Sequence, residues 1–310
     1  MSTTHGIHTV DTGFHRPDFD AAYLMVEDGR AAFIDTGTTH SVPRLMAALA
    51  AAGLRPEDAD WVIVTHVHLD HAGGAGALMQ ALPNARLLVH PRGERHMVDP
   101  SALIAGASEV YGADEVARAY GRIEPIAKER VVTSHDGMAV QLAGRTLTLL
   151  DTPGHARHHH CIWDERSRSF FTGDTFGLSY REFDTGNGPW LLPTTTPVHF
   201  DPAALKASVQ RLLSYAPEAM YLTHYGRVEG VPALGAMLLE QIDELVQLAL
   251  PLRDAHDRHA RLKQALASTY LRRVRHHGCT LPEDEVLRLL DNDIELNAQG
   301  IGVWLEGTTR

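Results

Sequence analysis

Cysteine is nearly absent from this sequence. Only Cys161 and Cys279 occur among 310 residues, and they stand far apart. Two isolated cysteines cannot supply the set of bridges on which small secreted domains depend. We therefore expect no disulfide framework, and we take the cytoplasm as the expected compartment.

Long hydrophobic runs are also lacking. No stretch approaches the roughly 20 consecutive apolar residues that cross a bilayer. The opening segment, residues 1–10, is polar and lacks the basic start and apolar run of a secretory signal. We therefore expect no membrane partner.

Basic residues are outnumbered by acidic ones. The chain has 28 Lys and Arg against 39 Asp and Glu, and its net charge is −11. Such a surface repels phosphate backbones, so we expect a small-molecule substrate and no nucleic-acid partner. Hydrophobic residues make up 44% and charged residues 22%, which is typical of a folded globular protein.

Histidine, in contrast, is abundant, with 20 residues in the chain. Three of them, with one aspartate, stand in the segment Thr65-His66-Val67-His68-Leu69-Asp70-His71, directly after an apolar strand. In an extended segment, residues i and i+2 face the same way, so His66 and His68 can share one ion. Asp70 and His71 lie where the chain turns into a helix, and they can point at a second ion. Imidazole and carboxylate together suit zinc, iron or manganese.

Three further candidates stand at the ends of apolar strands. His155 follows Asp151-Thr152-Pro153-Gly154, Asp174 follows Thr172-Gly173, and His224 follows Thr223. Each alone is ordinary turn chemistry. Ligands that arrive from several strand ends at one edge are, however, how a rigid site is assembled.

Strands and helices alternate along the first 230 residues. We expect strands at Ala21–Val26, Ala31–Ile34, Trp61–Thr65, Arg86–His90, Val131–Thr133, Ala139–Leu142, Thr146–Leu150, Cys161–Trp163, Ser169–Thr172 and Met220–Thr223. Helices are expected at about Val42–Ala52, Ala75–Leu82 and Asp201–Tyr215, the last capped by Asp201. Two sheets packed face to face with helices outside would satisfy this order.

The rest of the pattern is helical. Residues 101–129 are expected to form a helical insertion or lid. Beyond residue 231 we expect helices at Leu234–Leu250, Leu252–His276 and Glu283–Asp291. The predicted division is a catalytic domain, residues 1–231, and a helical C-terminal region, residues 232–310, which could cap the site or form a homodimer interface.

Across roughly residues 5–230 the sequence resembles the metallo-β-lactamase superfamily. The resemblance rests on the His66–His71 segment followed in order by His155, Asp174 and His224. It implies an α+β fold, the four-layer αββα sandwich of that superfamily, here with a C-terminal helical appendage. The ligand set is specific for the superfamily but says little about the substrate.

The resemblance also implies how the ligands are shared. One metal would be held by His66, His68 and His155, and a second by Asp70, His71 and His224. Asp174 would bridge the two metals. Asp35, after an early strand, would orient the ligand loop from behind, and His159 would stand near the metals without binding them.

A dinuclear site of this kind implies a hydrolase. Two divalent ions share a water, lower its pKa towards about 7, and the resulting hydroxide attacks a carbonyl or phosphoryl centre. Asp70 and Asp174 are the expected catalytic residues, Asp70 as proton relay and Asp174 as the group that sets the metal spacing. Zinc is the first expectation, with iron or manganese as alternatives.

The ligand order is similar to that of glyoxalase II, which points to a thioester. The sequence departs from that family after Asp174, where Phe176–Tyr180 lacks a Gly-Cys-Gly-Arg pattern, and around Thr223–Gly226, which differs from Gly-His-Glu-Tyr. Glutathione recognition is therefore not expected. The segments Leu192–Pro197 and Leu296–Gly300 resemble a less characterised prokaryotic branch, and an ester, lactone or thioester is the expected substrate.

Other functions stay open at this point. Persulfide dioxygenases of the superfamily use one iron, which here would be held by His66, His155 and Asp174. An RNA-processing nuclease or phosphodiesterase conflicts with the acidic composition. A metal-binding scaffold without activity is disfavoured by the complete ligand set.

Several residues near the motifs are assigned lesser roles. His158 and His160 are expected to be packed or solvated. Tyr180, Trp190 and Tyr225 are candidate substrate contacts, because aromatic side chains in loops can line a pocket.

Overall fold

The computed structural model describes residues 3–307 and contains two compact units. The first, which we call the sheet unit, comprises the described residues up to Asp151 together with His158–Gly173 and Ala216–Glu229. The second, the helical unit, comprises Thr152–Arg157, Asp174–Tyr215 and the described residues from Gly230 onward. The units are interleaved along the chain, unlike the single boundary after residue 231 that the sequence suggested.

The sheet unit contains a seven-stranded mixed sheet whose strand order follows the chain. Its first four strands are antiparallel, and its last four, counting from β4, are parallel. The strands are β1 (Thr3–Thr4), β2 (Ile7–Asp11), β3 (Ala21–Glu27), β4 (Arg30–Ile34), β5 (Ala59–Ile63), β6 (Arg86–Val89) and β7 (Val131–Thr133).

A six-stranded sheet forms the second layer of this unit, in the order β13-β12-β11-β10-β9-β8. Only β11 and β12 are parallel, and the other pairs are antiparallel. The strands are β8 (Ala139–Leu142), β9 (Arg145–Asp151), β10 (His160–Asp164), β11 (Ser169–Gly173), β12 (Ala219–Leu222) and β13 (Gly226–Val228).

Side-chain alternation along the strands separates two cores. Phe33 of β4 packs with Leu45, Leu49 and Leu78 in the core between the first sheet and its helices. Its neighbour Ile34 faces the other way, into the core between the two sheets. Because successive strand residues point to opposite faces, a strand buried on both faces reads as a continuous apolar run.

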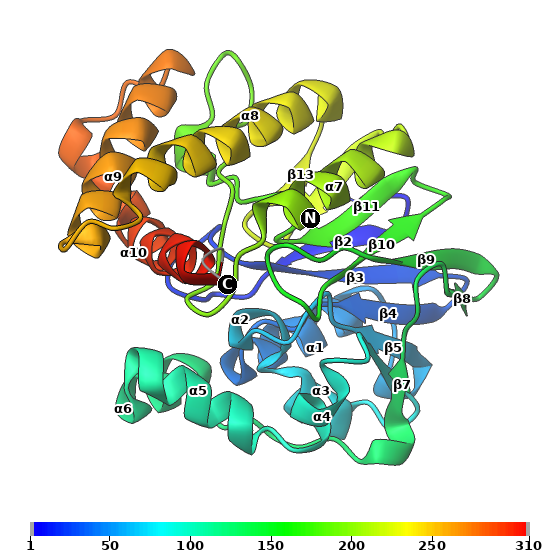
Figure 1. Ribbon diagram of the computed structural model, residues 1–310. Helices are drawn as coiled ribbons and strands as arrows, with labels where there is room; N and C mark the ends of the chain where they lie inside the picture. The colour runs from blue at the N-terminus through cyan, green and yellow to red at the C-terminus, as the bar shows by residue number, and fades with distance from the viewer. Residues whose placement is uncertain (1–2, 308–310) are drawn as a thin grey trace. The chain divides into compact units, whose positions relative to one another are not determined.

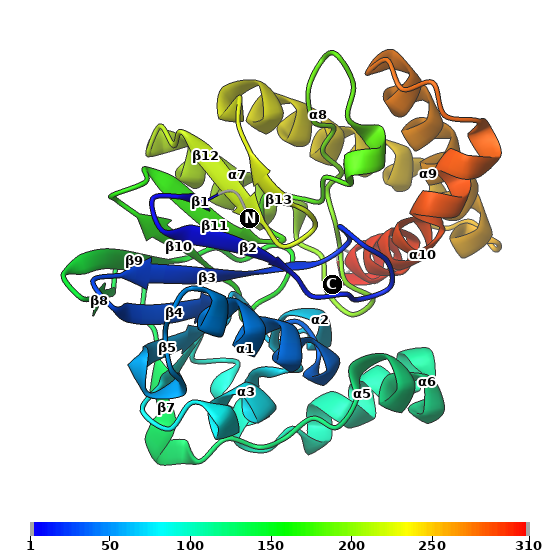
Figure 2. The same cartoon turned by 180° about the vertical axis from the view of Figure 1, so that it is seen from behind.

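Six helices belong to the sheet unit, and Figures 1 and 2 show α1 and α3 along the outer face of the first sheet. They are α1 (Val42–Ala51), α2 (Leu69–Ala72), α3 (Ala75–Ala81), α4 (Glu94–Val98), α5 (Ser101–Tyr111) and α6 (Ala113–Tyr120). Residues 101–129 are thus mainly helical, as expected. Leu69, Val116 and Ile123 form a small core between α2 and this segment.

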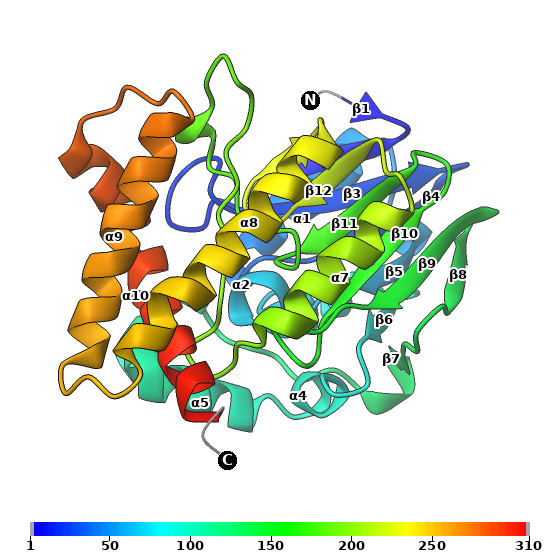
Figure 3. The same ribbon diagram turned by 45° about the horizontal axis from the view of Figure 1, so that its top comes forward.

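The helical unit is built on four helices, of which Figure 3 gives the clearest view. They are α7 (Pro202–Ser214), α8 (Val231–Ala249), α9 (Arg258–His276) and α10 (Glu283–Gly307). Asp201 caps α7 as predicted, because its Oδ1 accepts a hydrogen bond from the Ala204 amide at 3.0 Å.

Two helix boundaries differ from the sequence expectation. Helix α9 begins at Arg258 rather than Leu252, because residues 253–257 form a turn after the short 3₁₀ segment Leu250–Leu252. Helix α10 continues to Gly307 rather than ending near Asp291. Its buried face carries the polar or small residues Asp293, Asn297 and Gly300. These interrupt the apolar periodicity from which a helix is predicted.

The remaining predictions at this level concern membranes, cysteines and fold class. Across residues 3–307 no helix combines the length and apolar character needed to span a bilayer. Cys161 and Cys279 are both buried free thiols. The α+β fold with two mixed sheets, flanking helices and C-terminal helices is as predicted.

Candidate metal centre

The histidine-rich segment lies directly after the central strand β5 of the first sheet. His66 and His68 stand in the loop that follows β5, and helix α2 begins at Leu69 and carries Asp70 and His71. His68 has an extended backbone (φ −67°, ψ 151°). The Nε2 atom of His66 lies 2.7 Å from Nδ1 of His68, so the two rings face one point, as the i, i+2 spacing predicts.

Asp70, His71 and His224 form a second group in the sheet unit. One ligand atom from each lies within 4.8 Å of the other two. The Oδ2 atom of Asp70 is 3.8 Å from His71 Nε2 and 3.4 Å from His224 Nε2. His71 and His224 are buried, whereas 26% of the Asp70 side chain is exposed. Asp70 is therefore the most solvent-exposed member of this group.

Asp35 supports the ligand loop from behind, in the position predicted from the resemblance. Its carboxylate is 1% exposed and accepts hydrogen bonds from the Thr65 amide at 2.7 Å, the Thr223 hydroxyl at 2.9 Å and His71 Nδ1 at 2.9 Å. Thr65 precedes His66 and Thr223 precedes His224. One buried carboxylate thus holds the His71 ring directly, and it holds the residues that precede His66 and His224.

The hydrogen bonds of the ring nitrogens determine which nitrogen can bind a cation. A carboxylate or carbonyl oxygen only accepts, so His71 donates from Nδ1 to Asp35, and His224 donates from Nδ1 to the Phe19 carbonyl at 3.0 Å. In the neutral rings, Nε2 then carries the lone pair. Both lone pairs point towards the Asp70 carboxylate, an arrangement that a cation between them would stabilise.

His155 and Asp174 lie together in the helical unit. His155 Nε2 is 3.4 Å from Asp174 Oδ2, and both side chains are almost fully buried. The ring repeats the same orientation, because Nδ1 donates to the Thr194 carbonyl at 3.2 Å and Nε2 faces the carboxylate.

The turn that carries His155 is held by helix α7. The Asp201 amide donates to the Gly154 carbonyl at 3.0 Å, and the Ser208 hydroxyl donates to the Pro153 carbonyl at 2.7 Å. Gly154 has a φ of 137°, and a Cβ there would lie 2.4 Å from the Leu205 backbone. The Pro-Gly-His sequence therefore allows the turn to contact the helix closely.

The donor set fits a divalent metal. Buried imidazoles with Nδ1 engaged and Nε2 facing a carboxylate are the arrangement that metal-binding histidines adopt, and imidazole with carboxylate suits zinc and related ions. The clusters of histidine and aspartate agree with metal binding, and they do not discriminate between metals.

The three consecutive histidines after the turn have separate surroundings. The His159 ring stacks on His66 with centroids 4.8 Å apart. The His158 ring is half-buried, with its edge towards His68 at 5.4 Å. His160 is fully packed, bonded to the Ser134 hydroxyl at 2.8 Å and the Val64 carbonyl at 2.9 Å, and burial lowers its pKa to about 3. His160 is therefore a neutral core residue.

Alanine substitution separates His158 from His155. We expect H158A to keep its metal and most of its activity, because His158 packs beside the predicted ligands and is not itself one of them. H155A removes a predicted ligand and should lose bound metal. Metal analysis of both purified variants checks this pair, and a larger metal loss in H158A would show that the wrong histidine was chosen.

The segment before β3 contributes residues that the sequence analysis did not select. The Asp20 carboxyl is fully buried, and burial raises its pKa to about 7. Its Oδ2 accepts from the Thr12 hydroxyl at 2.6 Å. Phe19, besides accepting from His224, packs edge-on against that ring with centroids 5.4 Å apart. No motif marked these positions, because Asp18-Phe19-Asp20 reads as an ordinary strand entry.

Aromatic rings gather around Phe19 on the sheet unit. The ring centroid of Phe14 lies 6.1 Å from that of Phe19 and 5.4 Å from that of Tyr120 in α6. The ring centroid of the exposed His15 lies 5.2 Å from that of Phe19. We call Phe14, His15, Phe19 and Tyr120 the aromatic lip. Phe19 adjoins His224, Phe14 and Phe19 are each 8% exposed, and Tyr120 is half-buried.

The aromatic residues that the sequence suggested as substrate contacts are placed differently. Tyr180 is 2% exposed and donates to Asp293 at 3.1 Å, and Trp190 is 2% exposed and packs on Phe183. Tyr225 packs at the margin of the core between the sheets. Tyr180 and Trp190 therefore serve packing within the helical unit, because a side chain with so little exposure cannot line an open pocket.

Comparison with known proteins agrees with the ligand pattern. The sequence model described as "Metallo-beta-lactamase superfamily" matches residues 15–224. A metallo-beta-lactamase fold-containing protein of Sulfurisphaera tokodaii, ST1585, is 26% identical over 228 residues, which cover 72% of this chain and 79% of that protein. The crystal structure of ST1585 covers 96% of this chain and 99% of its own, with a TM-score of 0.66 and 22% identity.

Two relatives carry names of thioester-cleaving enzymes. A hydroxyacylglutathione hydrolase of Stenotrophomonas maltophilia is 31% identical over 183 residues, 59% of this chain and 56% of its own length. An atrochrysone carboxyl ACP thioesterase of Aspergillus fumigatus is 27% identical over 154 residues, 49% of this chain and 38% of its own. The alignments thus span about half or less of these two proteins.

The matched region begins at His15 of the aromatic lip and ends at His224, so it contains all the predicted ligands as well as Asp35. Since that region is more than half of the chain and the two mixed sheets agree with it, the protein belongs to the metallo-β-lactamase superfamily, whose members are generally metal-dependent hydrolases.

Proposed function

We propose that this protein is a dinuclear metal-dependent hydrolase that cleaves an ester, lactone or thioester. The observation that carries the proposal is the orientation of the rings of His71, His224 and His155. Each donates from Nδ1 to an oxygen and turns Nε2 towards a carboxylate. His66 and His68 would complete one metal site with His155, and Asp70 would complete the other with His71 and His224.

Covalent connections support a single metal centre that takes ligands from the sheet unit together with His155 and Asp174 of the helical unit. His155 is three residues from His158, a separation of at most about 11 Å between Cα atoms. Asp174 is bonded to Gly173, where a Cβ would lie 2.6 Å from the Thr65 hydroxyl and 2.7 Å from His159 Nε2. Both predicted ligands are therefore joined to the sheet unit by short stretches of chain.

The metals would supply a water of lowered pKa and a Lewis acid for the substrate oxygen. The protein's own part is orientation and proton handling. Asp35, the Phe19 carbonyl and the Thr194 carbonyl hold the imidazoles in one tautomer. Asp70, partly exposed, is the carboxylate that can accept a proton during turnover, and Asp174 would bridge the two metal sites.

For the substrate we favour a thioester or a related ester with an apolar acyl group. One relative is named a hydroxyacylglutathione hydrolase and another an ACP thioesterase, and the aromatic lip places apolar rings, of which Tyr120 is half-buried, near His224. Glutathione as the thiol part is not proposed, because Phe176–Tyr180 and Thr223–Gly226 depart from the pattern of glyoxalase II.

Metal analysis combined with a substrate panel tests the proposal. We expect about two divalent ions per chain and hydrolysis of chromogenic thioesters, esters or lactones in preference to phosphodiesters. Chelation should abolish turnover, and zinc should restore it. One iron per chain with thiol-dependent oxygen uptake would instead show a mononuclear dioxygenase, and phosphodiester cleavage would show a nuclease.

A further inference from the structure

Two sequence segments that contain no predicted metal ligand contact one another in the helical unit. One is the loop Leu192–Pro197, and the other is Leu296–Gly300 of helix α10. Asn297 joins them, since its side chain bonds to the backbone of Pro193 and of Thr195. Both segments are rich in small or polar residues, and neither belongs to the ligand motifs.

Asn297 is 1% exposed and uses both ends of its amide. Its Oδ1 accepts from the Thr195 amide at 2.8 Å. Its Nδ2 donates to the Pro193 carbonyl at 3.1 Å and to the Tyr270 hydroxyl at 2.8 Å. A buried amide is destabilising unless it is hydrogen-bonded, so these bonds fix the loop relative to Asn297.

The Thr195 amide belongs to the same peptide group as the Thr194 carbonyl, which accepts from His155 Nδ1 at 3.2 Å. A continuous chain of hydrogen bonds thus runs from the His155 ring through this one peptide to Asn297. Each bond in such a chain polarises the next. A carbonyl whose amide side is bonded accepts more strongly from the imidazole, and the imidazole binds a cation more tightly through Nε2.

The packing of α10 against the loop is unusually close at Gly300. A Cβ there would lie 2.2 Å from the Thr195 hydroxyl oxygen and 2.4 Å from the Thr196 carbonyl oxygen. Glycine in a helix interior is less favourable than alanine, so this position gives up helix stability for the contact. The Thr195 hydroxyl also donates to the Leu296 carbonyl at 3.2 Å.

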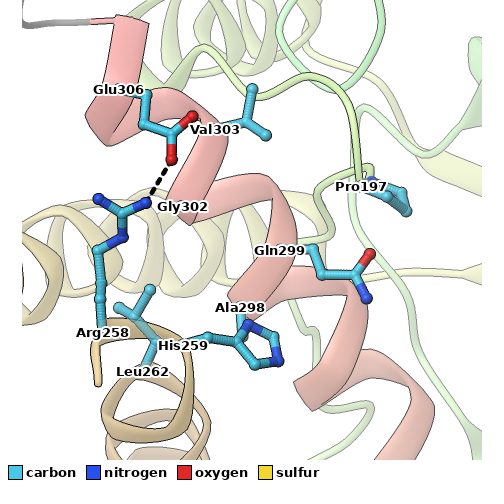
Figure 4. Close-up of a pocket in the computed structure, with 9 residues that line it drawn as sticks. All are labelled: Pro197, Arg258, His259, Leu262, Ala298, Gln299, Gly302, Val303 and Glu306. Atoms are coloured by element: carbon cyan, nitrogen blue, oxygen red, sulfur yellow. Dashed lines mark hydrogen bonds and ion pairs between the residues drawn. The ribbon is translucent and has the colours of Figure 1, made fainter. Parts of the chain in front are cut away.

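The outer side of this contact is an open groove, drawn in Figure 4. Pro197 of the loop lines it together with Gln299, Gly302 and Val303 of α10. Helix α8 holds the other end of the loop, because Gln241 Nε2 donates to the Leu191 carbonyl at 2.6 Å. The segment from Leu191 to Thr196 is therefore held by two helices of the C-terminal region.

We propose that Asn297 is a positioning residue for the metal centre, through the Thr194–Thr195 peptide and the His155 ring. The C-terminal helices then have a defined role, which is to set the orientation and basicity of one metal ligand. The inference rests on the proposed function, since it takes His155 as a ligand.

Two variants of α10 and one matched control test it. N297L removes the hydrogen bonds to the loop, and G300A displaces the loop while raising helix propensity. Y270F removes another hydrogen bond of Asn297 but none to the loop. Apo-protein is titrated with zinc alone and with cobalt alone, and the dissociation constants and the cobalt absorption spectra are recorded.

We expect N297L and G300A to weaken one of the two metals by about tenfold, the lower end of the range for residues behind a ligand. Their cobalt spectra should change, and Y270F should keep both affinities. Nitrogen NMR of labelled histidine should show His155 protonated on Nδ1 in the wild type and a mixture of tautomers in N297L. A loss of stability alone would not produce that signature.

Failure of the inference and failure of the proposed function give different results. If H155A loses a metal while N297L and G300A bind both as tightly as Y270F, Asn297 does not position His155. If H155A itself keeps both metals, the ligand assignment is wrong. Should N297L not fold, G300A and the wild-type NMR spectrum decide the inference.

Discussion

Replacing Asp174 with alanine is expected to lower the metal content from about two ions per chain and to reduce turnover by about 10²–10³-fold, as loss of one preorganised charged group does. The Asp174 carboxylate is 5% exposed and lies 3.4 Å from His155 Nε2. Without its negative charge, the repulsion between two cations held close together would be offset less.

The fold should survive the Asp174 substitution, because the residue follows β11 and contributes no strand pairing. Circular dichroism and metal analysis of the purified variant separate the two effects. Asp151 provides a control, since it ends strand β9 of the same sheet and bonds to His90 at 3.1 Å. We expect D151A to keep its metal. Wild-type metal content and activity in D174A would rule out a bridging role.

The second large effect is expected from Asp35→Asn, and it should appear in stability as well as in metal binding. Asp35 accepts from Thr65, His71 and Thr223, and all of these donors are buried. Its backbone has a φ of 55°, which asparagine tolerates, so the substitution changes the charge and one acceptor without adding backbone strain. The NH2 group of the new amide would face N–H and O–H groups that already donate to this position, so at least one hydrogen bond would be lost.

We expect D35N to lose about 3 kcal/mol of unfolding free energy, the cost of disrupting a buried charge with several hydrogen bonds. Chemical denaturation of the metal-free protein measures this directly. Asp20→Asn is the control, because the Asp20 carboxyl is also buried beside the site but its raised pKa, about 7, leaves it largely protonated below that pH. Equal losses in the two variants would mean that Asp35 has no special structural role.

Much of the fold follows from local pattern. The strands β3, β5 and β9 are apolar runs bounded by turns, and the structure places them within one or two residues of expectation. Helix α7 carries its own cap at Asp201. Helix α10 was underestimated because Asp293 and Asn297 occupy its buried face, where hydrogen-bond partners distant in sequence compensate for their polarity.

The substrate contacts show the limit of such reasoning. Tyr180 and Trp190 follow Asp174 in a loop-like stretch, yet their rings are buried within the helical unit. Phe19, which packs against His224, and Phe14, which packs against Phe19, lie in a stretch with no motif. Whether an aromatic ring packs or faces a site depends on the elements that surround it, and these are not encoded in the neighbouring residues.

The amino-acid sequence by itself determined the order and the type of the metal-binding side chains, because i, i+2 spacing and strand-end turns are local properties of the chain. Only the tertiary structure decided which further groups stand behind them, namely the carbonyls of Phe19 and Thr194 and, by our inference, Asn297. A backbone carbonyl has no signature in the sequence, and an asparagine on a helix gains its role only from the loop that folds against it.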